Sequence, residues 1–351
     1  MHRWESRRAF PFFCEVVMEI FAPEYYHRFR CIASACPDSC CKEWEVDVDE
    51  TTAEFYRELP GDLGDRLRAV LCETDRGSVM TITDGRCPMW QQDGLCRIQA
   101  ELGHDALCKV CREFPRLRHD YGDFAELGLE MSCPEAARMI FSDPVRSVKR
   151  WYEDGGEKAE YDKDVMATLR RSREEMLTFL ERGGYSLPQT LAVMLLYGYA
   201  VQGEMDGGEV AVLEVDACLE EAKGYAQPGE ICRIISFFQG LEILTPQWRD
   251  LLEQGAVNFG WTEALRPLLR YGIERYWLQA VSDFDLVCRV KFIIVACLLV
   301  NALGGDPIET SQLFSKEIEN DSDNVEAILD GTYTHPAFTD VHLLGLILCE
   351  T

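Results

Sequence analysis

The stretch from Cys31 to Trp44, CIASACPDSCCKEW, holds four cysteines in eleven positions. Disulfides, a bound metal or a redox-active thiol could each require so many thiols so close together. The chain has 16 cysteines, and ten of them lie between Cys31 and Cys133. We predict no export signal, so these thiols are expected to remain reduced. A metal site is therefore favoured over a disulfide framework.

Nine of these ten cysteines occur in turn-like contexts, where soft-metal ligands are expected. The tenth, Cys72, continues the apolar helical pattern of residues 62–71 and is expected in the core. The CKVC segment, Cys108–Cys111, separates two thiols by one helical turn, so both sulfurs can face one metal. Cys133 precedes a predicted helix, whose free backbone N–H groups should lower its pKa. The predicted metal ligands are Cys31, Cys36, Cys40, Cys41, Cys87, Cys96, Cys108, Cys111 and Cys133.

The spacing of these cysteines leaves the identity of the metal open. Zinc and iron–sulfur clusters both accept four thiolates. Zinc sites usually show two CxxC pairs, whereas this chain has one, and only His104 and His119 lie nearby. The irregular spacings suit a larger iron–sulfur cluster. The adjacent Cys40 and Cys41 should point apart in an extended chain, so that one ligates and the other packs.

Basic residues are concentrated beside the CKVC segment. Between Arg97 and Arg118 there are five basic and three acidic residues, in a chain that is otherwise strongly acidic. Arginines there could stabilise a thiolate-bound cluster or an anionic group of a cofactor, or could form an ordinary solvated helix face. The predicted cofactor-binding residues are Arg97, Arg112 and Arg116.

The net charge of −26 restricts the possible partners. Residues 1–150 carry 27 acidic and 20 basic residues, a net charge of −7, and residues 151–351 carry 34 and 15, a net charge of −19. Such a chain repels nucleic-acid phosphate and anionic lipid, so neither nucleic acid nor membrane is expected as a partner. A basic protein or peptide would suit it, although acidity also simply favours solubility.

The ends and apolar segments indicate a cytoplasmic protein. Pro11, Glu15 and Glu19 interrupt what would be the apolar core of a signal peptide. Met18 is a plausible start, which would make residues 1–17 an upstream extension without a role in the fold. The longest apolar run, Phe292–Leu303, has 12 residues where a membrane span needs about 20, so it predicts a buried core helix.

The pattern changes near residue 143. Residues 18–142 predict a cysteine-rich α+β metal-cluster domain, with a strand in EWEVDVD, a helix capped by Asp49 or Thr51, and a hairpin that turns near Tyr121–Asp123. From VRSVKRWYEDGG onward, apolar residues recur at spacings of three and four, which predicts an all-α domain over residues 143–351. The expected class is mainly α, with a small α+β region first. The scattered cysteines are expected in the core: Cys14, Cys218, Cys232, Cys288, Cys297 and Cys349.

Three segments together resemble the flagellin lysine-N-methylase family: FRCIASACPDSCCKEWEVDVD, CPMWQQDGLCRIQAELGHDALCKVCREFPR and MSCPEAARMI. Their order, spacing and flanking residues agree across about residues 19–140. The resemblance implies transfer of methyl groups from S-adenosylmethionine to lysine side chains of flagellin or a similar surface protein. It also implies an iron–sulfur cluster, 4Fe-4S before other types, with zinc as the alternative, held by some of the nine cysteines.

The residues by themselves do not identify a methyltransferase. The chain lacks a strand-GxGxxG-helix element, so adenosylmethionine would bind in another way. No catalytic residue is predicted. Asp38, Trp44, Glu113 and Tyr121 lie near the cysteines in sequence, but structural roles are expected for them. Two other functions stay open, a non-enzymatic interaction module stabilised by metal and an iron–sulfur redox or sensor protein.

Overall fold

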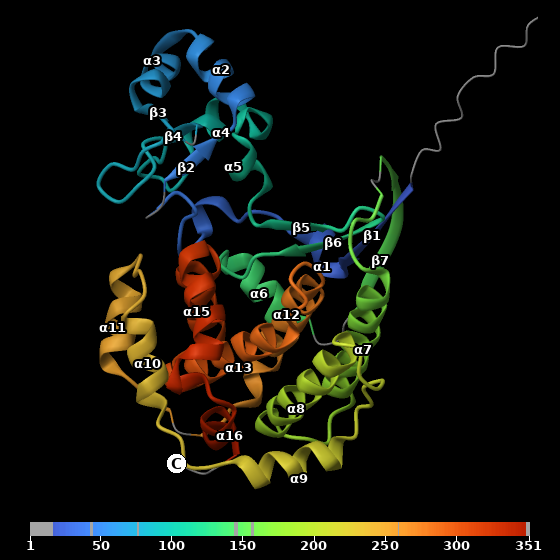
Figure 1. The fold of residues 1–351 in the computed structure, drawn as a ribbon. Helices are drawn as coiled ribbons and strands as arrows, with labels where there is room; N and C mark the ends of the chain where they lie inside the picture. The colour runs from blue at the N-terminus through green and yellow to red at the C-terminus, as the bar shows by residue number, and fades with distance from the viewer. Residues whose placement is uncertain are drawn as a thin grey trace, which may run out of the picture.

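The computed structural model describes residues 17–42, 45–75, 77–143, 147–155, 158–258 and 260–348. A small lobe of short helices and strands stands on a larger helical body, and a four-stranded sheet covers one face of that body (Figure 1). The predicted class, mainly α with a small α+β region, is confirmed.

The small lobe comprises residues 40–42, 45–75 and 77–113 and follows a loop that contains the turn η1 (Ala33–Ala35). Asp49 organises it, as predicted, because one of its carboxylate oxygens accepts the Thr52 N–H at 3.1 Å and the other accepts the Lys109 N–H at 2.8 Å. Two helices are thereby fixed at their first turns. The elements of the lobe are β2 (Val46–Val48), α2 (Glu50–Glu58), α3 (Gly61–Val70), β3 (Leu71–Thr74), β4 (Gly77–Met80), α4 (Arg97–Leu102), η2 (His104–Ala106) and α5 (Lys109–Glu113), with strand order β2-β4-β3.

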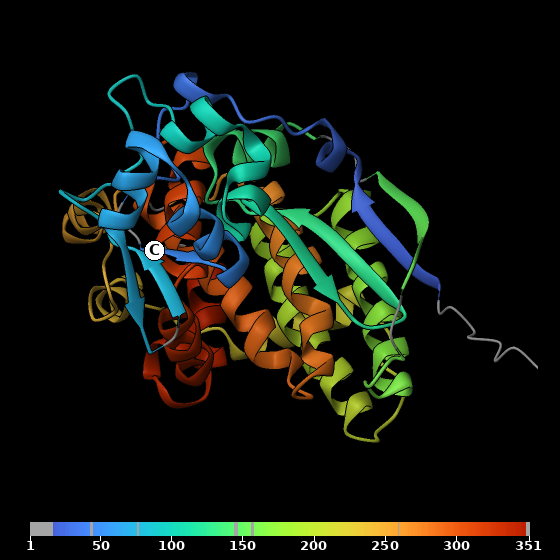
Figure 2. The ribbon, with the colours of Figure 1, turned by 90° about the horizontal axis from the view of Figure 1, so that it is seen from above.

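The four-stranded sheet has the order β5-β6-β1-β7, with β1 parallel to β6 and the other pairs antiparallel. The predicted hairpin is confirmed as β5 (Arg116–Asp120) and β6 (Phe124–Leu129). In the view from above, this hairpin lies across the helices of the body (Figure 2). The remaining elements are β1 (Val17–Pro23), β7 (Val148–Asp154), and the helices α1 (Glu24–Arg28) and α6 (Pro134–Ser142).

The helix predicted over VRSVKRWYEDGG is wrong. Strand β7 occupies this segment and pairs with β1 along its whole length, from Val17 opposite Asp154 to Pro23 opposite Val148. Only Trp151 is partly buried in β7, where it packs against Ile20 and its neighbours. The helical spacing of its apolar residues is overridden, because pairing with the edge of β1 satisfies the backbone hydrogen bonds of residues 148–154.

The helical body is built around α13 (Leu286–Leu303). Every residue of this helix is buried, as predicted, although it is long and apolar enough to cross a membrane. It packs against α8, α12 and α15. The other helices are α7 (Lys163–Arg182), α8 (Leu187–Met205), α9 (Val215–Tyr225), α10 (Ile231–Gln239), α11 (Pro246–Gln254), α12 (Arg266–Tyr276), α14 (Pro307–Phe314), α15 (Ser322–Thr334) and α16 (Asp340–Leu348). Short turns are η3 (Glu263–Leu265), η4 (Trp277–Val281), η5 (Ser315–Glu319) and η6 (Pro336–Phe338).

Two large apolar cores are present among the described residues. One fills the small lobe, and the other fills the body and includes Phe124, Leu129 and Met131 from the hairpin and the segment after it. The predicted boundary near residue 142 stays a prediction. Val17, the last residue of the predicted extension, already belongs to β1, and residues 1–16 lie outside the described part of the chain.

Two cysteines expected in the core are at the surface. Cys72 is exposed because α3 ends at Val70 and the chain continues as strand β3, where Cys72 faces outward and lies 3.9 Å from the Thr81 hydroxyl. Cys232 is exposed on α10. Cys288 and Cys297 are buried as expected, and Cys218 is half-buried. Cys14 and Cys349 lie outside the described residues.

Candidate functional site

Backbone pairing brings distant cysteines together in the small lobe. The N–H of Cys87 donates to the carbonyl of Cys41 at 2.8 Å, and Lys42 and Arg86 form a β-bridge beside it. A second bridge joins Trp90 to Cys96 and closes the loop between the two thiols of that segment. The first cysteine segment thus lies against the second, as a shared metal site requires.

Six of the nine predicted ligands form one thiol cluster. The Cys41 thiol is hydrogen-bonded to the thiols of Cys40 and Cys87, and Cys108 is hydrogen-bonded to Cys111. The prediction that Cys40 and Cys41 point apart is wrong, because they lie in a turn rather than in an extended strand. We call this set the thiol cluster; its members are Cys40, Cys41, Cys87, Cys96, Cys108 and Cys111.

Within the thiol cluster, some cysteines have a lowered pKa, which favours the thiolate, and others have a raised pKa, which favours the thiol. Hydrogen bonds from Cys41 and from backbone N–H groups lower the pKa of Cys87 to about 7. The hydrogen bond from Cys111 lowers the pKa of Cys108. The neighbouring thiolates and burial raise the pKa of Cys41 and of Cys111 well above the usual range. A cation would stabilise the additional thiolates and release their protons, which is how thiol sites bind metal.

The other three predicted ligands lie between the first cysteine loop and helix α6, next to the thiol cluster. Burial first, and then charges that include those of Cys31 and Cys40, raise the pKa of Cys36. The thiols of Cys36 and Cys31 both raise the pKa of Cys133. Cys133 is the N-cap of α6, as predicted, but burial outweighs the helix N–H groups and raises its pKa to about 12. The predicted lowering of this pKa is therefore wrong. None of these three cysteines is buried, whereas Cys87 and Cys108 of the thiol cluster are.

The chemistry of the thiol cluster fits a soft metal, because thiolates are the preferred ligands of zinc and of iron–sulfur clusters. Across the described ranges, however, no three His, Cys, Asp or Glu side chains are arranged to hold a metal ion. The structure thus brings the donors together without forming a coordination geometry.

The three arginines predicted to bind a cofactor do not meet at one site. Arg97 lies at the surface and pairs with Glu101 and Asp62, both at 2.6 Å. Arg112 donates to the carbonyl of Leu107 at 3.4 Å. Arg116 lies over the ring of Phe29 at 5.3 Å. Their predicted role stays a prediction.

Asp38 is one of the four residues noted near the cysteines. It joins the first cysteine loop, which precedes the small lobe, to the helical body. Its carboxylate lies 2.9 Å from the ammonium of Lys316, which is nearly buried in η5. Tyr121 stacks on Phe124, and Glu113 is exposed at the end of α5. Trp44 lies outside the described residues.

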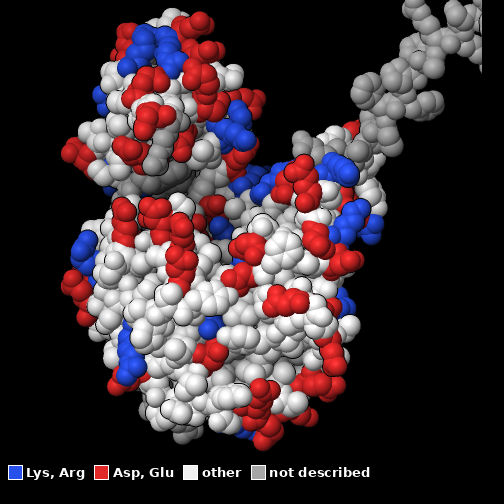
Figure 3. Space-filling model, viewed as in Figure 1, with Lys and Arg blue, Asp and Glu red and all other residues white. Residues whose placement is uncertain are grey.

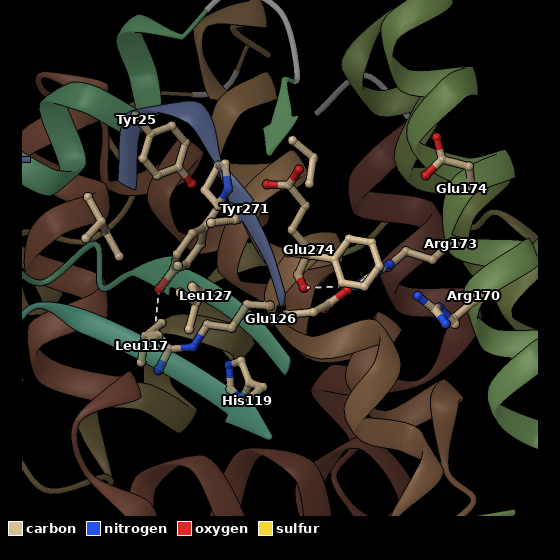
Figure 4. A pocket seen from close by; sticks show the side chains of 17 residues that line it. Tyr25, Leu117, His119, Glu126, Leu127, Arg170, Arg173, Glu174, Tyr271 and Glu274 are labelled. Atoms are coloured by element: carbon tan, nitrogen blue, oxygen red, sulfur yellow. Dashed lines mark hydrogen bonds and ion pairs between the residues drawn. The ribbon is translucent and has the colours of Figure 1, made fainter. Parts of the chain in front are cut away.

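A pocket of about 310 Å³ opens between the sheet and helices α7 and α12 (Figure 4). Its floor is made by alternating residues of the hairpin: Leu117 and His119 on β5 stand opposite Gly128 and Glu126 on β6. This pocket was not predicted from the sequence. One feature of the sequence could have indicated it: the polar residues His119 and Glu126 lie on one face of the predicted hairpin.

The pocket is lined by a network of buried charges. Arg173 of α7 binds Glu126 through two hydrogen bonds, at 2.7 and 2.5 Å. Arg275 of α12 lies 3.3 Å from Glu319, which also accepts the hydroxyl of Tyr271 at 2.8 Å. Burial, and then Arg275, lowers the pKa of His119 below its ordinary value of 6.5, so its imidazole is neutral at neutral pH. Such a pocket can bind a charged ligand away from bulk water.

Comparison with known proteins gives the family. The chain is 34% identical over 134 residues to the lysine-N-methylase of Salmonella typhimurium (strain LT2) and 35% identical over 130 residues to that of Salmonella choleraesuis. It is 33% identical to the flagellar biosynthetic protein FliU of Salmonella muenchen, of which the match covers 76%. The chain therefore belongs to the flagellin lysine-N-methylase family.

These matches cover only part of the proteins compared. Each involves 35% of this chain and, for the two lysine-N-methylases, 32% of the relative. No family model matches the chain. No solved structure matches it either.

Proposed function

We propose that this protein transfers methyl groups from S-adenosylmethionine to lysine side chains of flagellin or a similar surface protein. The observation that carries the proposal is the identity of 34% to a lysine-N-methylase over 134 residues. The name of the FliU relative adds a link to the flagellum. We place the reaction in the cytoplasm, where the thiols stay reduced.

The thiol cluster, in this proposal, holds an iron–sulfur cluster, most simply 4Fe-4S, or else zinc. Support comes from six cysteines of three chain segments whose thiols interact in one small lobe. The metal would supply folding energy to the lobe and fix its loops. Cys31, Cys36 and Cys133 either complete the ligand set or form a second site.

The acceptor lysine must lose its proton before it attacks the methyl group, because only the neutral amine is a nucleophile. The acidic body can attract the protonated lysine first. Acidic side chains gather on the body where it faces the small lobe (Figure 3). Asp323, Glu326 and Asp330 are exposed along α15. If neutralising all three leaves the KM for flagellin unchanged, even at low salt, this docking surface is excluded.

The proposal is tested by incubating anaerobically purified protein with labelled adenosylmethionine and flagellin. Label on flagellin lysines is the expected result, and its loss in Cys87→Ser but not in Cys72→Ser would connect transfer to the thiol cluster. Cys72 is the matched control because it is an exposed cysteine of the same lobe. Absence of label with iron present would favour a redox or sensor protein. A colourless zinc protein without transfer would favour a structural interaction module.

A further inference from the structure

The pocket between the sheet and helices α7 and α12 has the composition of a site for a zwitterion. Its apolar wall includes Leu117, Leu127, Leu129 and Phe21. Its charged lining contains three carboxylates and three guanidinium groups: Glu126, Glu174, Glu274, Arg170, Arg173 and Arg275. Neither sign of charge dominates. A ligand with one positive and one negative group would therefore match it better than a simple cation or anion.

Three nitrogen atoms around this pocket are buried without a hydrogen-bond partner among the described residues. They are Nε2 of His119, Nε of Arg173 and Nε of Arg275. Arg173 is 8% exposed, and its two terminal nitrogens already bind Glu126, so only Nε stays unmatched. Buried polar groups almost always have partners. Three exceptions around one cavity indicate a ligand that supplies hydrogen-bond acceptors.

The two arginine nitrogens can only donate, and their charge favours an anionic acceptor. A carboxylate is such an acceptor and can receive both N–H groups. Neutral His119 can donate to the same ligand through Nε2 in one tautomer. Glu126, directly opposite His119 in the hairpin, provides carboxylate oxygens that can accept from an ammonium group. Carboxylate and ammonium are the two charged groups that an α-amino acid carries.

We infer that this pocket binds the α-amino-acid end of the methyl donor, with Arg275 and Arg173 donating to its carboxylate and Glu126 accepting from its ammonium. This inference rests on the proposed use of adenosylmethionine. Donor binding is thereby placed between the sheet and the helical body, whereas the sequence predicted it at Arg97, Arg112 and Arg116.

Equilibrium binding of three probes tests the inference on the full-length protein. The probes are S-adenosylhomocysteine, 5′-methylthioadenosine, which has the same thioether nucleoside but no amino-acid group, and L-methionine. Because the arginines would make charged hydrogen bonds to the carboxylate, we expect methylthioadenosine to bind at least about tenfold more weakly than S-adenosylhomocysteine.

Two variants test whether the pocket causes this difference in affinity between S-adenosylhomocysteine and methylthioadenosine. Arg275→Lys keeps a positive charge beside Glu319 but removes the Nε donor, and His119→Leu removes an imidazole whose Nε2 has no partner. Each should weaken S-adenosylhomocysteine about tenfold and leave methylthioadenosine unchanged. Arg270→Lys is the matched control, since Arg270 lies on the same helix but donates to the Ile140 and Asp143 carbonyls. Thermal unfolding of each variant confirms that it is folded.

The possible outcomes distinguish failure of the inferred binding pocket from failure of the proposed function. If S-adenosylhomocysteine binds both variants as tightly as wild type while flagellin is methylated, the inference is overturned and the proposed function stands. If L-methionine binds and the variants weaken it, but flagellin is never methylated, the amino-acid site stands and the proposed function falls. If no probe binds and no methyl group is transferred, both are overturned.

Discussion

The small lobe and the helical body differ in the size of their apolar cores. The body surrounds α13, in which all residues from Leu286 to Leu303 are buried. The core of the lobe has thirteen buried residues, and two of these are the cysteines Cys87 and Cys108. A core in a segment of this size is only marginally stabilising, and small natural domains often add a metal or disulfides to it. In the proposed function, metal bound by the cysteines supplies to the lobe the stability that apolar packing supplies to the body.

Metal removal should give the largest difference between the two regions. Structural zinc contributes about 10–16 kcal/mol of apparent binding free energy in small metal-dependent domains. We expect chelation to unfold residues 45–113 while the body stays folded. Hydrogen exchange followed by mass spectrometry would show loss of protection in the lobe and unchanged protection in α13. Unchanged protection in both regions would contradict the expectation that the lobe depends on metal and the body does not.

A substitution that creates a cavity in the body should destabilise the body and leave the small lobe unchanged. Leu299 is fully buried in α13, and Leu299→Ala should lower the free energy of unfolding of the body by about 3 kcal/mol. Metal content should be unaffected, because the core of the lobe is separate. Urea unfolding and metal analysis of the same preparation measure the two quantities. Loss of metal in this variant would show that the regions fold as one unit.

The ion pair between Asp38 and Lys316 tests how the regions are joined. The Lys316 side chain is 10% exposed and that of Asp38 is 24% exposed. Lys316→Met removes the charged hydrogen bond that Asp38 accepts at 2.9 Å but keeps its ion pair with Lys42 at 3.3 Å, so it should cost roughly 2 kcal/mol. Hydrogen exchange should rise in residues 36–42. Lys223→Met, at an exposed pair, is the control and should change stability by less than about 0.5 kcal/mol.

The smallest expected effect is the pH dependence that His119 gives to the body. Burial, Arg275 and Arg173 lower its pKa, and Glu126 opposes them. Because the folded-state pKa lies below the ordinary value of 6.5, its contribution to stability is complete above pH 6.5 and is lost as the pH falls through the folded-state pKa. Urea unfolding at about pH 7.5 and about pH 5.5 should show a smaller decrease for His119→Leu than for wild type. Equal decreases would contradict this assignment.

Local patterns predicted much of the fold. The hairpin of residues 116–131, the Asp49 cap and the buried helix at Phe292–Leu303 each follow from periodicity or capping chemistry within one segment. Strand β7 could not be predicted in this way, because its structure depends on the free edge of β1, far away in sequence.

The candidate site has two parts, the cysteines and the pocket. The sequence singled out the cysteines but not the pocket. The nine cysteines stood out by composition, but which of their thiols are hydrogen-bonded to one another depends on turns and burial that the sequence does not reveal. The pocket was missed because its lining comes from β1, β5, β6, α7 and α12, with no local motif. Only the facing pair of His119 and Glu126 could have indicated it.

Anaerobic metal and acid-labile sulfide analysis of freshly purified protein tests the central claim most directly. Iron with sulfide, or zinc, should be present in stoichiometric amount in wild type and in Cys72→Ser, and should be lost in Cys87→Ser. A wild-type protein without iron or zinc, or equal metal content in all three proteins, would contradict the claim that the thiol cluster is a metal site.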